Sequence, residues 1–452
     1  MRTASKLCRK AIIVGAKGLV KKGNVEKSVG IKNTTTSMIC QVLHGALNES
    51  NLSVNDLDGF LALPSLAEHH IVEAHFQATQ LGLFSRNESD VNRQPSLLCR
   101  TIDTGGAGPV SALLQAQNMI QHEGLNCVAV VAADSVGSMD SGTFLKRVDD
   151  IFGNEEGDIP SPIIPNGYDR YTQYQMQKYG LTRDQLRMVV CLQSFHASRH
   201  QESLLYQTQQ QATQTEHPKR DPPKPFTTLE DIQQAIPVTP NISLLECAYR
   251  ADGAGCIIMT SNSFLNERVG RETEQVNNRA VTILGGGESS GPLVPPPKEQ
   301  IGEFSFGSDA AMAKAYRQAG ILTASDIDFF ALYDCFPICL IRALEAAGVC
   351  SKGDGGDYIE IQYSKLIDAM EIGKEEELMQ DPTFFPVNTH GGLLCFGAPW
   401  EVPAMYHIIE AIQQLTGNAV GRQIDDCKRA LVYGNGGIFS SSAVAILEKN
   451  TS

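Results

Sequence analysis

A segment of eleven residues occurs twice in this chain of 452 residues. Leu52–Ala62 (LSVNDLDGFLA) returns as Leu322–Leu332 (LTASDIDFFAL), 270 residues later and without a gap. Aspartates fall on aspartates, and apolar residues fall mostly on apolar residues. Solenoid repeats have a much shorter period. The spacing therefore predicts two copies of one whole domain.

The two copies end differently, and this difference predicts where the chemistry lies. The first copy runs into Leu63-Pro64-Ser65, whereas the second ends in the polar cluster Tyr333-Asp334-Cys335-Phe336. Two equal scaffolds with unequal endings are typical of a pseudosymmetric enzyme. We expect the reacting groups to lie beside the second copy.

Charge and cysteine usage exclude several classes of protein. The chain has 37 basic and 51 acidic residues, which gives a net charge of −14 and opposes nucleic-acid binding. Its 12 cysteines show no framework spacing and no secretory signal precedes them, which indicates reduced thiols inside the cell. Cys335 and Cys339 have no matching second pair, so we expect no zinc site and no cofactor.

The ends of the chain bear on its location. No apolar run is long enough for a membrane-spanning helix. Residues 1–10 are basic and hydroxylated, and the first acidic residue is Glu26. This composition predicts a short mitochondrial presequence, with a solvated tail on a cytosolic protein as the alternative. The final residues do not form a peroxisomal signal.

Strands and helices alternate in both halves of the chain. The apolar strands are continuous rather than alternating, which indicates that both faces of each sheet are covered. We expect an α/β protein in which two αβα units stack as five layers. The predicted strands are 11–15, 57–63, 127–133, 252–259, 280–284, 327–332, 430–433 and 443–447. The predicted helices of the two halves are 34–47, 110–120, 310–319, 337–347 and 402–415.

A segment of different composition separates the halves. It contains glutamine and proline runs and one clear helix, 182–197, which Thr182 and Gln185 cap. We therefore predict an N-terminal domain of residues 1–138 and 247–268, a loop domain of residues 139–246, and a C-terminal domain of residues 269–452.

Several motifs resemble those of the sterol-carrier-protein-type thiolases. The box Tyr333–Phe336 resembles their His-Asp-Cys-Phe box, with a tyrosine first as in the trypanosomatid thiolase-like type. Residues 388–392 (NTHGG) and 397–399 (GAP) resemble their Asn-x-x-Gly-Gly and Gly-His-Pro stretch with the same spacing. Residues 434–437 (GNGG) stand where thiolases carry Cys-x-Gly. The similarity implies a thiolase fold over residues 10–449, and a homodimer.

The departures from the family decide the predicted chemistry. Gly105 or Gly106 occupies the position of the nucleophilic cysteine at a helix N-terminus, and Ala398 replaces the histidine of Gly-His-Pro. Cys99 is the nearest thiol and lies in a predicted strand. Without a thiol that a helix and a histidine activate, we expect no acyl-enzyme and no ordinary thiolase turnover.

The resemblance also implies what remains of the site. Backbone N–H groups of Gly105 or Gly106 and of Gly436 would form one oxyanion site. Tyr333, His390 or Asn388 would rebuild the second site, and Cys335 would act as the acid. Asp334 is expected to cap the helix that begins at Pro337. Simpler interpretations stay open: a buried structural cysteine, a strand-end tyrosine and a loop histidine.

These residues favour a protein that binds short acyl-CoA thioesters, such as malonyl-CoA and acetoacetyl-CoA, in lipid metabolism. At most we expect slow decarboxylation of malonyl-CoA through an enolate. The alternative is a non-catalytic CoA-ester sensor or a scaffold for another enzyme. A third possibility, an active thiolase, would need Cys99 or Cys395 as its nucleophile. Contacts with the CoA phosphates would come from a group of basic residues: Lys146, Arg147, Arg183, Lys219, Arg220 and Lys224.

Overall fold

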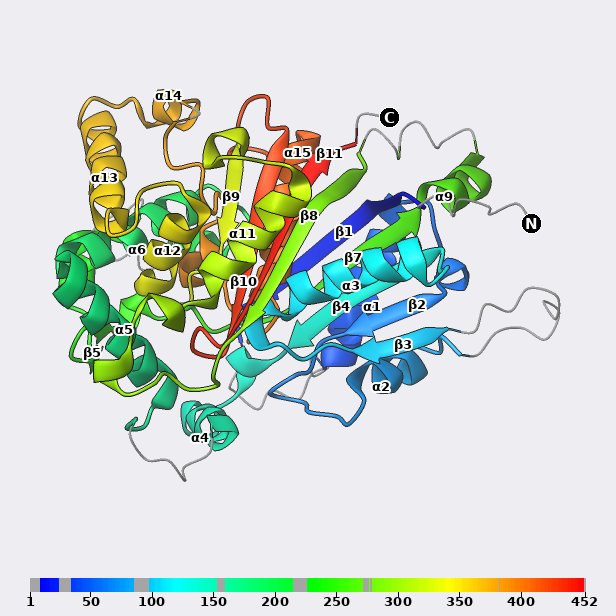
Figure 1. Ribbon diagram of the computed structural model, residues 1–452, viewed down its shortest axis with the longest axis horizontal. Helices are drawn as coiled ribbons and strands as arrows, with labels where there is room; N and C mark the ends of the chain where they lie inside the picture. Colours follow the sequence, from blue (N-terminus) through cyan, green and yellow to red (C-terminus); the bar gives the residue numbers. More distant parts are fainter. Residues whose placement is uncertain are drawn as a thin grey trace.

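The computed structural model describes residues 9–23, 34–84, 97–152, 159–213, 226–270, 276, 279–381 and 383–450 (Figure 1). The basic N-terminal residues 1–8 and the candidate CoA contacts Lys219, Arg220 and Lys224 lie outside these ranges. Within the described residues, no helix is both long and apolar enough to cross a membrane.

Each half of the chain contributes a set of strands with helices on both sides. The first half comprises β1 (Ala11–Lys21), α1 (Thr35–Glu49), β2 (Gly59–Ala62), α2 (Glu73–Gln80), β3 (Leu98–Thr101), α3 (Gly108–His122), β4 (Cys127–Asp134), β7 (Asp252–Ser261) and α9 (Asn262–Val269). The second comprises β8 (Val281–Ser290), α11 (Gly307–Ala319), β9 (Phe329–Leu332), α12 (Pro337–Ala347), α13 (Gly355–Glu371), α14 (Glu375–Met379), α15 (Pro403–Thr416), β10 (Arg429–Gly436) and β11 (Ser441–Lys449).

The repeat found in the sequence is a repeat of structure. Adding 270 to the bounds of β2 gives those of β9, and the same shift carries the first residue of β1 onto that of β8. The repeated aspartates explain why the pattern persists. Asp58 accepts hydrogen bonds from the backbone N–H groups of Asn126 and Cys127, and Asp328 accepts them from those of Lys428 and Arg429. In each half, the carboxylate precedes one strand and binds backbone N–H groups at the start of the parallel neighbouring strand.

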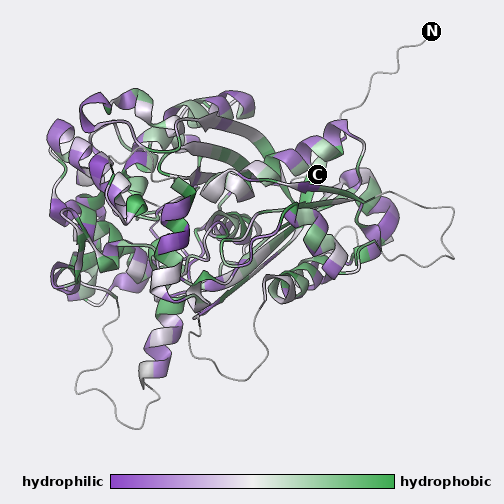
Figure 2. Cartoon of the chain, turned by 90° about the horizontal axis from the view of Figure 1, so that it is seen from below, coloured by the Kyte–Doolittle hydropathy of each residue, from purple (hydrophilic) through white to green (hydrophobic). Residues whose placement is uncertain are grey.

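The strands of the two halves form one nine-stranded sheet in the order β3-β2-β4-β7-β1-β8-β11-β10-β9. The two halves join at a single residue pair, Ile13 with Val281. The predicted five layers are confirmed: α3 and α15 form the middle layer and contact strands of both halves. Helices α1 and α2 cover the outer face of one half, and α11 and α12 cover that of the other. The outer helices mix hydrophilic and hydrophobic residues, as covering helices do (Figure 2).

The segment between the halves is mainly helical and packs against the second half. It comprises α4 (Ser141–Phe152), α5 (Ile163–Tyr179), α6 (Arg183–Ala197), α7 (Leu204–Thr213), α8 (Leu229–Gln233) and the short strands β5 (Pro237–Thr239) and β6 (Ile242–Ser243). The predicted capping box of Thr182 and Gln185 is present at the start of α6. The exact domain boundaries given above stay a prediction.

A buried ion cluster attaches this segment to the second half. Arg342 of α12 is fully buried, and its guanidinium lies 2.9 Å from Glu345 and 3.0 Å from Glu303. Glu303 also accepts hydrogen bonds from Tyr174, Tyr179 and Lys178 at the end of α5. These cations and donors hold the pKa of the Glu303 carboxyl well below its usual range despite partial burial, which opposes the shift.

We predict that Asp58→Ala and Asp328→Ala each destabilise the protein by about 2 kcal/mol, because each removes the acceptor of two backbone N–H groups. Asp58 is the more buried of the two and should show the larger loss. Urea denaturation measures both. Asp150→Ala, an exposed site on α4, is the matched control. A loss no greater than the control's would contradict the proposed strand-joining function of these carboxylates.

Candidate functional site

The start of α3 meets the end of β10, and glycines make this contact possible. A Cβ atom on Gly105 would lie 3.0 Å from Gly436 Cα, and one on Gly436 would overlap the carbonyl oxygen of Thr104. A Cβ atom on Gly434 would lie 2.9 Å from Ala107 Cα. Gly105 has φ of +60°, which glycine adopts readily. The structure thus brings together Gly105, Gly106 and Gly436, the three glycines predicted from the sequence.

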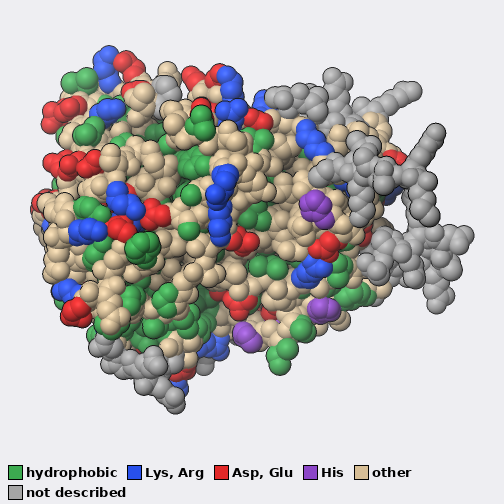
Figure 3. All heavy atoms as spheres, viewed as in Figure 1, with side chains coloured by type: hydrophobic (Ala, Val, Ile, Leu, Met, Phe, Trp, Pro, Cys, Tyr) green, Lys and Arg blue, Asp and Glu red, His purple; other side chains and the backbone are tan. Residues whose placement is uncertain are grey.

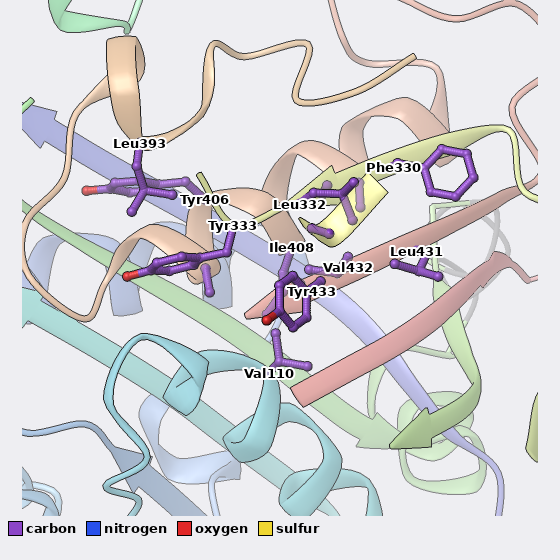
Figure 4. Packing of buried hydrophobic residues seen from close by; sticks show 14 of the residues in the cluster. Val110, Phe330, Leu332, Tyr333, Leu393, Tyr406, Ile408, Leu431, Val432 and Tyr433 are labelled. Atoms are coloured by element: carbon purple, nitrogen blue, oxygen red, sulfur yellow. The ribbon is translucent and has the colours of Figure 1, made fainter. Parts of the chain in front are cut away.

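The hydroxyl of Tyr333 occupies the space that a side chain at residue 106 would need. A Cβ atom on Gly106 would overlap Tyr333 Oη and would lie 2.5 Å from Cζ, the ring carbon that carries it. Tyr333 is 6% exposed, and burial raises the pKa of its phenol well above the usual value. Figure 4 shows Tyr333 among buried residues of β9, β10, α3 and α15. Tyr333 therefore fills the space over Gly106, one of the two glycines that the resemblance aligns with the thiolase nucleophile.

The cysteines predicted as possible reacting groups have different surroundings. Cys335 is partly buried, and its Sγ lies 3.5 Å from Cys339 Sγ. Cys99 lies in β3, as predicted, and burial raises the pKa of its thiol to about 11. Burial also raises the pKa of the Cys395 thiol well above its usual value. Burial therefore opposes a thiolate nucleophile at Cys99 or Cys395.

Asp334 does not cap the helix that begins at Pro337, so this prediction is wrong. Its Oδ1 instead accepts a hydrogen bond of 2.7 Å from the backbone N–H of Leu393, at the π-helical turn Gly392–Phe396. The N-cap residue of α12 is Phe336, which makes no side-chain cap. Asp334 is fully buried, and this burial raises the pKa of its carboxyl to about 8.

Asn388 and His390 are buried beneath the box. The side-chain amide of Asn388 donates to Leu332 O and accepts from Leu332 N, both at 2.7 Å. These bonds commit it to holding the end of β9. His390 is 2% exposed, its Nδ1 has no hydrogen-bond partner, and burial holds its pKa well below the usual value. We therefore expect His390 to be neutral.

Two functional candidates have no motif in the sequence. His407 of α15 lies close to two of the predicted site residues: its ring centroid is 4.9 Å from that of His390 and 6.3 Å from that of Tyr333. Its Nε2 is 3.9 Å from Asp334 Oδ1, and burial lowers its pKa to about 3. Glu401 precedes α15, and its buried Oε2 has no hydrogen-bond partner. Only its position directly after residues 397–400 could have drawn attention to it.

Two of the basic residues that we predicted to contact the CoA phosphates already bind other groups of the protein. Arg147 donates to the carbonyl oxygens of Leu66 and Ala67, and Arg183 pairs with Glu246. On the face drawn in Figure 3, Lys and Arg side chains lie among Asp and Glu rather than in one continuous basic area. A hollow of about 510 Å³ lies along α13, away from Tyr333, and three carboxylates line it. That hollow is unsuited to phosphates.

We predict that Gly106→Ala destabilises the protein by about 1–3 kcal/mol, because the new methyl group overlaps Tyr333. Tyr333→Ala alone should cost more, since it empties a buried site. In the double variant the two losses should be less than additive by at least about 1 kcal/mol. Urea denaturation of all four proteins measures the coupling. Additive losses would show that Tyr333 does not occupy the space above Gly106.

We predict that Asp334 makes stability fall as pH rises. Its pKa is higher in the folded protein (about 8) than its ordinary value of 3.8. The folded state therefore binds the extra proton between about pH 4 and pH 8, at a slope of up to about 1.4 kcal/mol per pH unit. Asp334→Asn keeps an acceptor for Leu393 and should remove this slope. Denaturation at several pH values tests this, and an unchanged slope in the variant would contradict it.

Comparison with known proteins agrees with this fold. Residues 304–449 match the family described as thiolase C-terminal domain-like. The chain is 25% identical over 286 residues to the acetyl-CoA acetyltransferase of Methanothermobacter thermautotrophicus and 23% identical over 335 residues to sterol carrier protein 2 of Bos taurus. These matches span 63% and 72% of this chain, but only 63% and 54% of the two relatives.

Solved structures match almost the whole chain. The Ltp2-ChsH2(DUF35) aldolase has a TM-score of 0.70 at 20% identity and covers 98% of both chains. The SCP2-thiolase-like protein type 1 of Mycobacterium smegmatis has a TM-score of 0.65 at 15% identity and covers 98% of this chain and 78% of its own. The fold is thus the predicted thiolase fold. The matched C-terminal domain and the curated relatives make this chain similar to the thiolase superfamily, and in particular to the sterol-carrier-protein-type thiolases.

Proposed function

We propose that this protein binds short acyl-CoA thioesters and stabilises their enolates without forming an acyl-enzyme. One observation carries the proposal: the hydroxyl of Tyr333 stands over Gly106 at the start of α3. Gly106 is one of the two positions that the resemblance aligns with the thiolase nucleophile. A phenol in that position cannot form the thioester intermediate. It can donate a hydrogen bond to a thioester oxygen that becomes negative, or donate a proton to the carbon beside it.

The backbone supports this chemistry. N–H groups at the start of α3 have no partners within the helix, and the helix dipole favours negative charge there. Gly436 lies against this turn, so its N–H is a further candidate donor. Since burial keeps the Tyr333 phenol protonated, a neutral donor faces the developing oxyanion. The acid that gives its proton to the enolate carbon is Cys335 or Tyr333 itself.

Malonyl-CoA decarboxylation is the reaction predicted from the sequence. The electron pair of the breaking carbon–carbon bond passes into the thioester, carbon dioxide leaves, and the resulting enolate takes one proton to give acetyl-CoA. No metal, oxidant or covalent intermediate is needed. A homodimer and a mitochondrial location, with a cytosolic location as the alternative, belong to the same proposal.

Retro-aldol cleavage is a second candidate. An aldolase is among the solved structures of similar fold, and its match covers 98% of this chain. Cleavage of a 3-hydroxyacyl-CoA gives an aldehyde or ketone and the same enolate of the shorter acyl-CoA. It differs in one requirement, because a base must remove the proton of the 3-hydroxyl group. The non-catalytic sensor or scaffold remains the alternative, and it requires binding alone.

We predict that Tyr333→Phe lowers turnover by at least about 100-fold and leaves the dissociation constant for the substrate within threefold. Carbon dioxide release from carboxyl-labelled malonyl-CoA and aldehyde release from 3-hydroxybutyryl-CoA measure turnover. Calorimetry with the same esters and with free CoA measures binding. The matched control is Tyr316→Phe, a tyrosine that donates to Ala347 O away from the site.

The outcomes separate the hypotheses. Binding of CoA esters without turnover of either substrate would favour the sensor. Turnover that Tyr333→Phe leaves intact would contradict the proposal. If, in addition, Cys335→Ser abolishes turnover, the acid is the cysteine predicted from the sequence and the function proposed for Tyr333 is wrong.

A further inference from the structure

We propose that Glu401 is a catalytic base of this site, and that it accepts the proton of a 3-hydroxyl group on the acyl-CoA substrate. The inference rests on the proposed function, enolate stabilisation at the start of α3, and it selects the retro-aldol reaction over decarboxylation. A base is what retro-aldol cleavage requires beyond the oxyanion donors.

The position of Glu401 supports this assignment. Its Oε2 would lie 3.9 Å from a Cβ atom on Gly108, the first residue of α3. Gly106, over which Tyr333 stands, is two residues earlier on the same turn. Glu401 itself stands two residues before the first residue of α15. The carboxyl therefore lies near the N-terminal ends of the two middle-layer helices, beside the turn against which the Tyr333 hydroxyl packs.

The hydrogen bonding of Glu401 differs from that of its neighbouring carboxyl. Asp134 accepts hydrogen bonds from the backbone N–H groups of Leu66, Ala67 and Ser135, which commits both of its oxygens to holding a loop. Glu401 Oε2 is buried and accepts none. A buried carboxyl oxygen without a donor is costly. A substrate hydroxyl group would supply the missing donor.

The charges around Glu401 argue for a neutral substituent on the substrate. Asp103 before α3 and Asp134 at the end of β4 face Glu401, and with burial, the largest cause, they raise the pKa of its carboxyl well above the usual value. A side-chain hydrogen bond from Trp400 partly offsets this rise in the pKa of Glu401. Burial raises the pKa of the nearby Tyr333 phenol, and the charge of Glu401 adds to that rise. The carboxylate of malonyl-CoA would meet this negative field, whereas a hydroxyl would not.

The proposed step balances. Glu401 takes the hydroxyl proton, the oxygen lone pair forms the carbonyl double bond, and the bond between the second and third carbons breaks. Its electron pair passes into the thioester, whose oxygen the α3 turn and Tyr333 stabilise. The enolate then takes one proton, and Glu401 returns its own to solvent or to the product. The raised pKa makes the Glu401 carboxylate a stronger base than an ordinary glutamate.

We predict that Glu401→Gln lowers aldehyde release from 3-hydroxybutyryl-CoA by at least about 100-fold while its dissociation constant stays within threefold. The variant should also bind malonyl-CoA at least about tenfold more tightly than the wild type does. Activity of the wild type should rise with pH as Glu401 ionises, and Glu401→Asp should retain this rise. The matched control is Glu123→Gln, at the opposite end of α3. Thermal melting of each variant checks folding.

Each outcome is informative. If the wild type releases carbon dioxide from malonyl-CoA but no aldehyde, or if Glu401→Gln keeps full aldehyde release, this inference is overturned and the proposed function stands. If the wild type turns over neither ester, both are overturned. If Tyr333→Phe has no effect on a reaction that Glu401→Gln abolishes, the function assigned to Tyr333 is wrong, while Glu401 remains the base.

Discussion

The packing of Tyr333 against a residue without a side chain is the constraint on which the site depends. The phenol comes from the second half of the chain, and Gly106 comes from the first. A nucleophilic side chain at residue 106 and the Tyr333 hydroxyl would need the same volume, so the site holds one or the other. A side chain from one half of the chain thus fills the space that a glycine of the other half leaves open.

The groups around α3 divide into a neutral side and an acidic side. Burial keeps the Tyr333 phenol and the Asp334 carboxyl protonated and holds His390 and His407 in their neutral forms. On the other side, burial and the charges of Asp103 and Asp134 raise the pKa of the Glu401 carboxyl well above its usual value. The positive end of the α3 dipole lies between the two. An arrangement of this kind favours a negative oxygen at one point and disfavours a second negative charge beside it.

The sequence predicted most of the fold and the backbone of the site. The repeated aspartates made the duplication visible because Asp58 and Asp328 bind the same backbone groups in each half. The glycines were predictable because their spacing matches a family pattern. Asp334 was misassigned because a local helix start suggested a cap, whereas its partner, Leu393, lies 59 residues further along the chain. Glu401 and His407 were missed because only the tertiary fold brings them near Tyr333.

The pairing of Ile13 with Val281 has a consequence for how the protein behaves among its own copies. Two separate sheets would present four free edges, each a row of unpaired backbone donors and acceptors. Joining β1 to β8 turns two of these edges inward, even though only one residue pair forms the contact. On the β9 side, Phe330 also bridges to Val387. Among the described strands this leaves β3 as the main open edge, so the duplicated architecture reduces the surface on which strands of separate molecules can add to one another.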